Sequence, residues 1–265
     1  MKPLNEPSIA FLMYHELELP GRELCELESG YKRYVVPEAA FRTQMKWLRS
    51  RNCVGVSVSK ALEFSAADQA AITFDDGCET DLITAAPILA EVGFGATFYV
   101  TTGFLGLRGY MTQHQVRQLK AAGFEIGCHS MTHPYLNDLR SAEQQREIAG
   151  SKNQLEQILG CRVDHFSCPG GRFNHRVIEV VKEAGYTTLA TSHPRLNAVT
   201  TDHFCLGRIA VLRNTNLKQF TGMCDGRGLW TMTLGQNIRG AAKRLLGNQL
   251  YDRMRQALLL EPDSR

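Results

Sequence analysis

Short apolar runs recur along the chain, separated by longer segments in which apolar residues return every three or four positions. Short apolar runs are typical of buried strands, whereas a spacing of three or four is typical of amphipathic helices. Because the two patterns alternate, the sequence predicts an α/β fold in which a parallel sheet or barrel is wrapped by helices. The strand-like runs cover residues 8–15, 70–74, 96–101, 125–128, 163–167, 186–190 and 205–211.

Three helices can be placed from the signals at their ends. Pro37 suits a helix start, and Phe41, Met45 and Leu48 follow it at helical spacing. The other two helices carry both a start and a stop signal. Ser141 with Gln144 resembles a capping box that opens a helix to about Leu159 before Gly160, and Asn174 can cap residues 176–184 before Gly185.

Composition favours one domain of ordinary globular character. The 265 residues are 43% hydrophobic and 22% charged, which allows one sizeable core. The net charge of +3 does not indicate a nucleic-acid partner. Residues 1–7 have prolines and an acid where a signal peptide would have a basic end and an apolar core, and no run is long enough for a membrane-spanning helix. The 8 cysteines include no Cys-x-x-Cys pair, so we expect free thiols and a cytoplasmic location.

Two adjacent carboxylates, Asp75 and Asp76, follow the apolar run that ends at Phe74. Like charges at the end of a buried strand repel each other, which raises the pKa of at least one unless a cation or a hydrogen-bonded partner offsets the repulsion. Gly77 fits a sharp turn there, so the carboxylates would project from the carboxyl end of a strand, where α/β folds keep their sites. The pattern therefore indicates a metal site, although Asp-Asp-Gly is also an ordinary surface turn.

Two histidines follow the next-but-one strand-like run. His129 and His133 stand four residues apart after residues 125–128. If His129 ends the strand and His133 opens the next turn or helix, both imidazoles can converge on one ion. Imidazole with carboxylate is a ligand set that zinc and similar divalent metals accept.

These segments resemble the first two motifs of the NodB-like polysaccharide deacetylases, carbohydrate esterase family 4, and residues 166–172 (FSCPGGR) resemble a variant of the third motif. The resemblance covers roughly residues 9 to 212. It implies a deformed (β/α) barrel and gives Asp75 the role of general base. Asp76, His129 and His133 become the ligands of a divalent metal, most often Zn²⁺, with Co²⁺, Mn²⁺ or Ni²⁺ as further options.

Two departures from the family pattern concern the proton donor and the arginine that orients the base. The late segment 205–214 has no histidine, whereas the first strand ends in Met-Tyr-His, as in a subgroup with circularly permuted motif order. His15 is therefore the expected general acid, with a strand-end cap as the alternative. Ser167 stands where many relatives carry the orienting arginine, and Arg208 or Arg172 could supply the guanidinium instead. Arg208 is favoured because a charge inside an apolar strand is costly unless it is paired, while an outward-facing Arg208 is the competing interpretation.

Several further side chains adjoin these positions. Cys78 and Cys128 could be additional ligands, but small buried thiols are the simpler interpretation. Trp230, Phe173 and Tyr135 could stack on sugar rings or pack within the fold.

The last part of the chain differs from the rest. We expect a catalytic domain over residues 1–228 and a basic, amphipathic helical extension over residues 229–265. Such an extension could bind an anionic membrane or a partner subunit, or pack on its own domain.

The resemblance, together with these residues, implies a metal-dependent hydrolase that removes N-acetyl groups from N-acetylhexosamine units of a polysaccharide or of its lipid-linked precursor. A hydrolase of a non-sugar amide is the second enzymatic hypothesis. A carbohydrate-binding or scaffold protein that has lost turnover is the third, supported by the missing late histidine and by Ser167.

Overall fold

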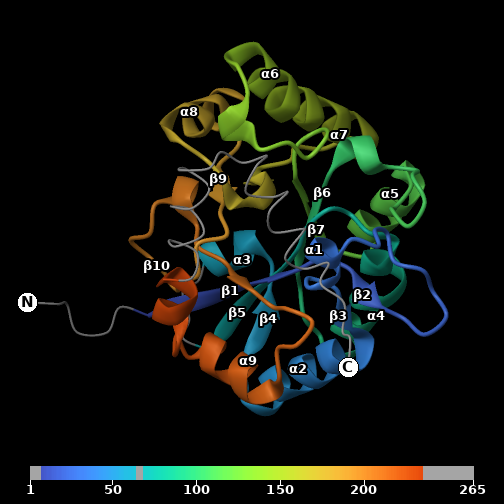
Figure 1. Ribbon diagram of the computed structural model, residues 1–265, viewed down its shortest axis with the longest axis vertical. Coiled ribbons are helices and arrows are strands. Elements are labelled where there is room, and N and C mark those ends of the chain that lie inside the picture. The colour runs from blue at the N-terminus through green and yellow to red at the C-terminus, as the bar shows by residue number, and fades with distance from the viewer. Residues whose placement is uncertain (1–6, 64–67, 235–265) are drawn as a thin grey trace, which may run out of the picture.

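The computed structural model describes residues 7–63 and 68–234 of the chain (Figure 1). Its central element is a curled sheet of nine strands among these residues, and every pairing is parallel except that of β10 with β1. The strands run in the order β10, β1, β5, β6, β7, β8, β9, with β4 beside β5 and β11 beside β1. They are β1 (Ser8–Tyr14), β4 (Val54–Val56), β5 (Gln69–Phe74), β6 (Thr97–Val100), β7 (Glu125–Cys128), β8 (His165–Ser167), β9 (Thr188–Ala190), β10 (Asn197–Ala198) and β11 (Ile209–Ala210).

The sheet curls because the segment before β11 returns to it. Leu206 bridges Ala190 in parallel, and Ile209 then pairs with Leu12 in β1. The last strand thereby links the two ends of the series of parallel strands. This arrangement is a deformed (β/α) barrel, and the predicted fold class is confirmed.

Most of the helices lie around the outside of the curled sheet (Figure 1), whereas Val58 and Ala61 of α3 pack with Ile9 and Phe11 on the other face. A separate small ladder of two strands lies near α1 and α2. The helices are α1 (Ser29–Lys32), α2 (Glu38–Ser50), α3 (Val58–Glu63), α4 (Ala86–Glu91), α5 (Gln113–Ala121), α6 (Ser141–Gln145), α7 (Ser151–Leu159), α8 (His175–Glu183) and α9 (Leu217–Cys224). The small ladder pairs β2 (Leu17–Glu18) with β3 (Val36–Pro37); short turns are η1 (Asp81–Ala85), η2 (Thr102–Phe104), η3 (Leu136–Asp138), η4 (Arg146–Gly150), η5 (Pro169–Gly171) and η6 (His203–Cys205).

The sheet is apolar on both faces because each face is covered. In β1, Leu12 and Tyr14 belong to the large core cluster that includes the buried face of α2. Ile9 and Phe11 alternate with them and join a smaller cluster with Tyr99. Burial on both faces explains why the strands appear in the sequence as continuous apolar runs.

The predicted strand over residues 205–211 is wrong in its length, because only β11 pairs as a strand. The preceding Gly207 bonds to a side chain: its N–H donates to Asn197 Oδ1 at 2.8 Å, and its carbonyl accepts from Asn197 Nδ2 at 2.8 Å. These two hydrogen bonds take the place of strand pairing at Gly207. Arg208 follows directly, at the point where the chain enters β11.

The predicted helix over residues 141–159 is present but differs at its start and in its middle. Arg140 is the N-cap, and its N–H donates to Glu143 Oε2 at 2.9 Å, so the predicted pairing of Ser141 with Gln144 is one residue out of register. A single turn of π-helix, η4, then interrupts the helix. Gly160 ends it at φ 68°, as expected for a glycine that follows a helix.

The predicted boundary at residue 229 stays a prediction, because residues 235–265 lie outside the described part of the chain. The described start of the extension is helical, and Leu229 is buried in the large core cluster. Membrane or subunit contact through the extension is likewise untested. Among the described residues, no helix is both long and apolar enough to cross a bilayer.

Candidate active site and metal centre

The sequence-predicted site residues come together at one end of the barrel, where parallel strands finish. His15 follows β1, Asp75 and Asp76 follow β5, and His129 follows β7. Arg208 immediately precedes β11. Parallel strands bring these positions together although they are far apart in sequence, as is usual for sites in α/β folds.

Asp75 and Arg208 form a buried bidentate ion pair. Arg208 Nη1 donates to Asp75 Oδ1 at 2.7 Å, and Nη2 donates to Oδ2 at 2.8 Å. Arg208 Nε donates to the Thr191 carbonyl at 2.9 Å, which fixes the plane of the guanidinium. Arg208 is 0% exposed, so the outward-facing interpretation is wrong. Two parallel bonds fix the orientation of the carboxylate more firmly than one bond would.

Ser167 completes the surroundings of this pair. Its hydroxyl accepts from Arg208 Nη2 at 2.7 Å and donates to Asp75 Oδ2 at 3.2 Å. Burial by itself would raise the pKa of Asp75, but the adjacent charge of Arg208, followed by His129, outweighs burial and lowers that pKa below its usual value. Asp75 is therefore an oriented, ionised carboxylate at neutral pH.

Three potential metal ligands lie beside the Asp75 pair. Asp76 Oδ1 is 3.6 Å from His129 Nε2 and 3.5 Å from His133 Nε2, and one ligand atom from each residue lies within 4.8 Å of the others. Asp76 Oδ1 is buried and has no hydrogen-bond partner among the described residues. A buried oxygen without a donor, facing two imidazoles, fits a divalent cation.

The second nitrogen of His129 supports the same interpretation. His129 Nδ1 lies 2.8 Å from the Ser167 carbonyl oxygen, which can only accept a hydrogen bond. The proton is therefore on Nδ1, and Nε2 keeps a free lone pair toward Asp76. Burial is the main cause that lowers the pKa of His129 to about 4, so its ring is neutral at pH 7.

The backbone around the ligands adopts unusual conformations. Asp76, Ser130 and His133 have positive φ values of 78°, 64° and 61°. Residues other than glycine rarely adopt this region, and such strain clusters at functional sites. The Ser130 hydroxyl accepts the His133 N–H at 3.0 Å and so supports the turn between the two histidines.

Glu147 stabilises the turn between His129 and His133, and it was not predicted from the sequence. Its Oε2 accepts the N–H groups of Met131 at 3.0 Å and Thr132 at 2.8 Å, while Oε1 accepts the Thr132 hydroxyl at 2.7 Å. Glu147 is 8% exposed and lies in the π-turn η4. A carboxylate next to the buried Ile148 on a core-facing helix was the available signal.

His15 and Arg172 occupy different parts of the site. The His15 ring packs on Tyr34 with centroids 4.8 Å apart, and its buried Nδ1 has no hydrogen-bond partner among the described residues. Its charge is among the causes that lower the pKa of Asp75, so it lies within electrostatic reach of the base. The Arg172 guanidinium instead lies over the Tyr135 ring at 4.0 Å, while Arg208 holds both oxygens of Asp75.

The remaining candidates have separate surroundings. The Cys128 thiol donates to the Ser151 hydroxyl at 3.1 Å. Cys128 belongs to the core, which agrees with its interpretation as a small buried thiol. Phe173 packs edge-on against His193, with centroids 6.0 Å apart. Trp230 is 70% exposed. Cys78 lies in a second cluster, described below.

Sequence comparison finds proteins that are similar to this chain. Residues 65–189 match the family model described as polysaccharide deacetylase. A putative polysaccharide deacetylase of Bacillus subtilis is 26% identical over 216 residues, which are 79% of this chain and 72% of that protein. A peptidoglycan-N-acetylglucosamine deacetylase of Bacillus cereus is 32% identical over 123 residues, which are 46% of this chain and 55% of that protein.

A solved structure shows the same fold. The Streptococcus pyogenes deacetylase in complex with acetate superimposes with a TM-score of 0.72 at 23% identity, covering 83% of this chain and 99% of the other. The family match, the relatives and the shared fold agree with one another. Residues 65–189 of the chain therefore match a polysaccharide deacetylase domain, and the fold around them is of the NodB-like type.

Proposed function

We propose that this chain is a metal-dependent hydrolase that removes N-acetyl groups from N-acetylhexosamine units of a glycan or of its lipid-linked precursor. The observation that carries the proposal is the Asp75–Arg208 pair beside a ligand group of Asp76, His129 and His133. A carboxylate held by an arginine next to a potential metal site suits activation of water for amide hydrolysis. The relative named as an N-acetylglucosamine deacetylase supports the choice of amide.

Asp75 accepts the proton of the attacking water. Its two oxygens are fixed by Arg208, so the lone pairs point in one direction before substrate binds. The low pKa keeps Asp75 ionised but also makes it a weak base. The reaction therefore needs a water that is more acidic than bulk water.

Asp76, His129 and His133 would hold the cation, and Zn²⁺ is the best fit to two imidazoles and one carboxylate. When bound, a divalent cation lowers the pKa of water and polarises the acetyl carbonyl. The chain supports these ligands through the Ser167 carbonyl, which orients His129. Glu147 supports the turn between the two histidines.

His15 donates the proton that the departing amine needs. An imidazole can change its charge near neutral pH, which suits a general acid. Packing on Tyr34 limits the orientation of the ring. The carboxyl end of β1 places His15 at the same edge of the barrel as Asp75.

The loop after β8 is the proposed wall for the sugar. Gly170, at φ 60°, approaches the Tyr135 ring so closely that an added Cβ would lie 2.7 Å from Cε1. Arg172 then covers the same ring. Phe173 follows Arg172 in the same loop, and aromatic side chains with a charged neighbour suit contact with a sugar ring.

Acetate release tests the proposal directly. Purified chain loaded with Zn²⁺ should release acetate from N-acetylglucosamine oligomers, and Asp75→Asn should reduce the rate at least about 100-fold, because the amide cannot accept the proton. Asp68→Asn, at an exposed aspartate, is the matched control and should keep full activity.

Each competing hypothesis has its own result. Acetate release that persists after chelation and dialysis would exclude the metal-dependent reaction. Faster hydrolysis of compact non-sugar amides than of glycans would replace the substrate class. Tight glycan binding with no acetate release at any metal concentration would favour a binding or scaffold protein.

A further inference from the structure

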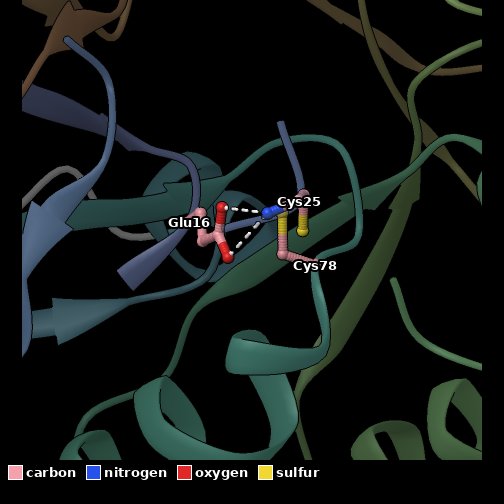
Figure 2. A group of neighbouring side chains, drawn as sticks. All are labelled: Glu16, Cys25 and Cys78. Carbon is pink, nitrogen blue, oxygen red and sulfur yellow. Dashed lines mark hydrogen bonds between the residues drawn. The ribbon is translucent and has the colours of Figure 1, made fainter. Parts of the chain in front are cut away.

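A second cluster of reactive side chains lies beside the proposed active site. Figure 2 shows the side chains of Glu16, Cys25 and Cys78 grouped together. One carboxylate oxygen or sulfur atom from each lies within 4.8 Å of the others. Glu16 follows His15 directly, and Cys78 follows Gly77 of the Asp-Asp-Gly turn. Glu16 and Cys78 are both fully buried, whereas Cys25 is half-buried.

The carboxylate of Glu16 has no free capacity for a cation. It accepts from Arg22 Nη1 at 2.9 Å, from the Cys25 N–H at 2.9 Å and from the Tyr31 hydroxyl at 3.0 Å. The Cys25 N–H is shared with the second oxygen at 3.2 Å, so both oxygens are engaged. Arg22 also brings a positive charge into the cluster, which opposes a bound dication. The sulfur atoms of Cys25 and Cys78 lie within 4.8 Å of each other.

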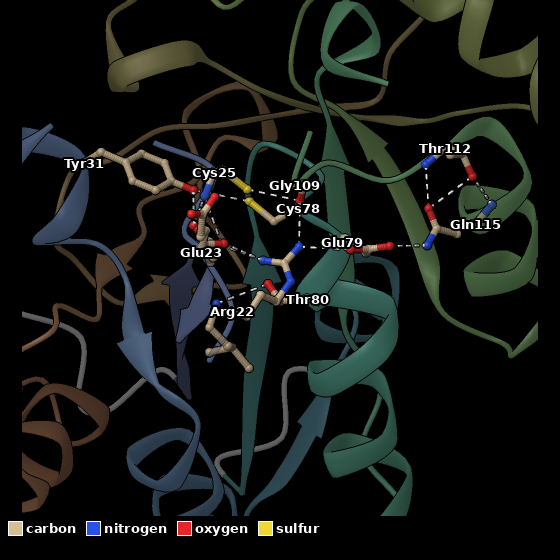
Figure 3. Close-up of polar contacts among 12 residues, drawn as sticks. Arg22, Glu23, Cys25, Tyr31, Cys78, Glu79, Thr80, Gly109, Thr112 and Gln115 are labelled. Atoms are coloured by element: carbon tan, nitrogen blue, oxygen red, sulfur yellow. Dashed lines mark hydrogen bonds and ion pairs between the residues drawn. The ribbon is translucent and has the colours of Figure 1, made fainter. Parts of the chain in front are cut away.

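Cys25 is held in place from both its backbone and its side chain. Its thiol donates to the Gly109 carbonyl at 3.1 Å, which also accepts from Arg22 Nη2 at 3.2 Å (Figure 3). Gly109 has φ 89°, and an added Cβ would lie 2.8 Å from Cys25 Sγ. Only glycine at position 109 allows the thiol to come this close.

Cys78 is fixed against the same segment. It forms an antiparallel bridge with Tyr110, the neighbour of Gly109. Its sulfur lies 3.4 Å from the Tyr31 hydroxyl oxygen. Because that hydroxyl donates its only proton to Glu16, the thiol of Cys78 donates to the hydroxyl oxygen. The Cys25 thiol and the Cys78 backbone are therefore both anchored to residues 109–110, and the two sulfur atoms lie within 4.8 Å of each other.

We propose that Cys25 and Cys78 are a redox-active pair that closes to a disulfide when a low-molecular-weight disulfide is the oxidant. The deprotonated sulfur of Cys25, the more accessible of the two, attacks one sulfur of the oxidant, which forms a mixed disulfide and releases one thiol. Cys78 then attacks the Cys25 sulfur, which forms the Cys25–Cys78 bond and releases the second thiol. The two protons lost by the cysteines end on the two released thiols.

The bond would fasten the loop after β1 to the turn that carries Asp75 and Asp76. Cys25 lies in the segment of residues 16–34, which follows β1 and includes β2 and α1, and Cys78 lies two residues after Asp76. Closing this ring restricts the unfolded chain and the local opening of the loop. Oxidation should therefore raise the thermal unfolding midpoint and protect Arg22 and Lys32, within the loop, from trypsin.

The test uses the full chain equilibrated with mixtures of reduced and oxidised glutathione, followed by alkylation and peptide mass spectrometry. The expected product is a cross-linked peptide pair containing Cys25 and Cys78 that has lost two hydrogen masses. In Cys78→Ser, glutathione should instead stay attached to Cys25, because the second attack is missing. The two control variants are Cys53→Ser, at a half-buried cysteine, and Cys161→Ser, at an exposed one. Both should form the Cys25–Cys78 bond at the same ratio of oxidised to reduced glutathione as the wild-type chain.

Three results would overturn the proposal. Glutathione that remains on Cys25 in the wild-type chain would show that Cys78 cannot reach it. Oxidation of Cys161 under conditions that leave both Cys25 and Cys78 reduced would show that the pair has no special reactivity. A zinc equivalent lost in Cys25→Ser but kept in His133→Ala would make the cluster a metal site. The cross-linked peptides are identified in the wild-type chain, so this result does not depend on whether any variant folds.

Discussion

Asp75 and Asp76 are adjacent in sequence but have different partners. The positive φ of Asp76 turns the chain between them, so Asp75 faces Arg208 and Asp76 faces His129 and His133. One carboxylate is neutralised by a fixed cation, and the other is left without a donor. The arrangement resolves the repulsion inferred from sequence and gives each carboxylate its own chemistry.

Arg208→Lys tests the orienting role of the guanidinium. A lysine can place one charge near Asp75, but it cannot donate to both oxygens and to the Thr191 carbonyl at once. We expect kcat to fall at least about 100-fold with a small change in KM, because the loss affects the base rather than substrate binding. Steady-state acetate release measures both constants.

Arg213→Lys is the matched control for this change. Arg213 also contacts both oxygens of one carboxylate, Glu18, but this pair is more than one third exposed. Its replacement should leave kcat within about twofold, because exposed ion pairs contribute little. Equal losses in the two variants would argue that Arg208 serves stability alone.

Glu147→Gln tests whether the turn below His133 sets metal affinity. The amide oxygen can take the place of Oε2 and keep both N–H bonds, but the amide nitrogen cannot accept the Thr132 hydroxyl proton, and the negative charge that the three donors now share is lost. We expect zinc affinity to weaken about 10-fold to 100-fold, as replacement of groups behind metal ligands commonly does. Competition with a chromophoric chelator gives the dissociation constant without an activity assay.

Glu143→Gln, on the same helical segment, is the control for Glu147. Glu143 accepts the Arg140 N–H at the helix start, and glutamine can keep that bond. Zinc affinity should be unchanged in this variant. If Glu147→Gln also binds zinc as the wild type does, the turn holds its shape without the carboxylate.

At the scale of elements, the strands were predictable and the connections were not. Continuous apolar runs predict β5 at residues 70–74 and β7 at residues 125–128, because both faces of these strands are buried. The π-turn η4 and the shortened β11 depend on partners far along the chain, such as Asn197 bonding to Gly207. No local pattern carries that information.

The site divides in the same way. Asp75, Asp76, His129 and His133 could be named from the motifs that they form. Arg208 could be inferred only as a charge in an apolar segment, and Glu147 was missed because its partners are backbone N–H groups. Backbone acceptors and donors are the same for every sequence, so such a partner leaves no motif.

The opposite end of the barrel contains a largely buried carboxylate that links stability to pH. Glu125 at the start of β7 lies 3.4 Å from His165 Nε2, accepts from the Ser59 N–H at 3.3 Å and accepts from the Thr97 hydroxyl. Burial is the largest single cause and raises the pKa of Glu125. Hydrogen bonds from His165, Ser59 and Thr97, together with the electrostatic effect of His165, outweigh burial and lower the pKa to about 2.

A lowered pKa in the folded state stabilises the fold where the carboxylate is ionised. The contribution is present above pH 4.5, the ordinary value of the group, and is lost as pH falls toward about 2. Glu125→Gln should therefore lower the free energy of unfolding by about 1–3 kcal/mol at pH 7 and less at pH 3. Urea unfolding at several pH values measures this difference. A difference that stays constant down to pH 2 would contradict the assignment.

At the scale of the whole molecule, folding assembles the proposed metal site. Asp76 and His133 come from the ends of different strands and lie within 3.5 Å only in the folded chain. A cation that binds only the folded state stabilises it by mass action, by about 2.7 kcal/mol at 100 times the dissociation constant. Zinc should therefore raise the thermal unfolding midpoint by several degrees, and chelator should reverse the rise.

His133→Ala separates this site from any other zinc-binding group. The His133 side chain is 35% exposed, so its removal should cost little stability without metal. The zinc-induced rise should nevertheless disappear, whereas His203→Ala, at an exposed histidine, should retain it. A rise of wild-type size in His133→Ala would mean that zinc stabilises the chain elsewhere, and the ligand set proposed for catalysis would be wrong. Differential scanning fluorimetry with and without zinc decides between the two, because the unfolding midpoint responds to binding whether or not the enzyme turns over.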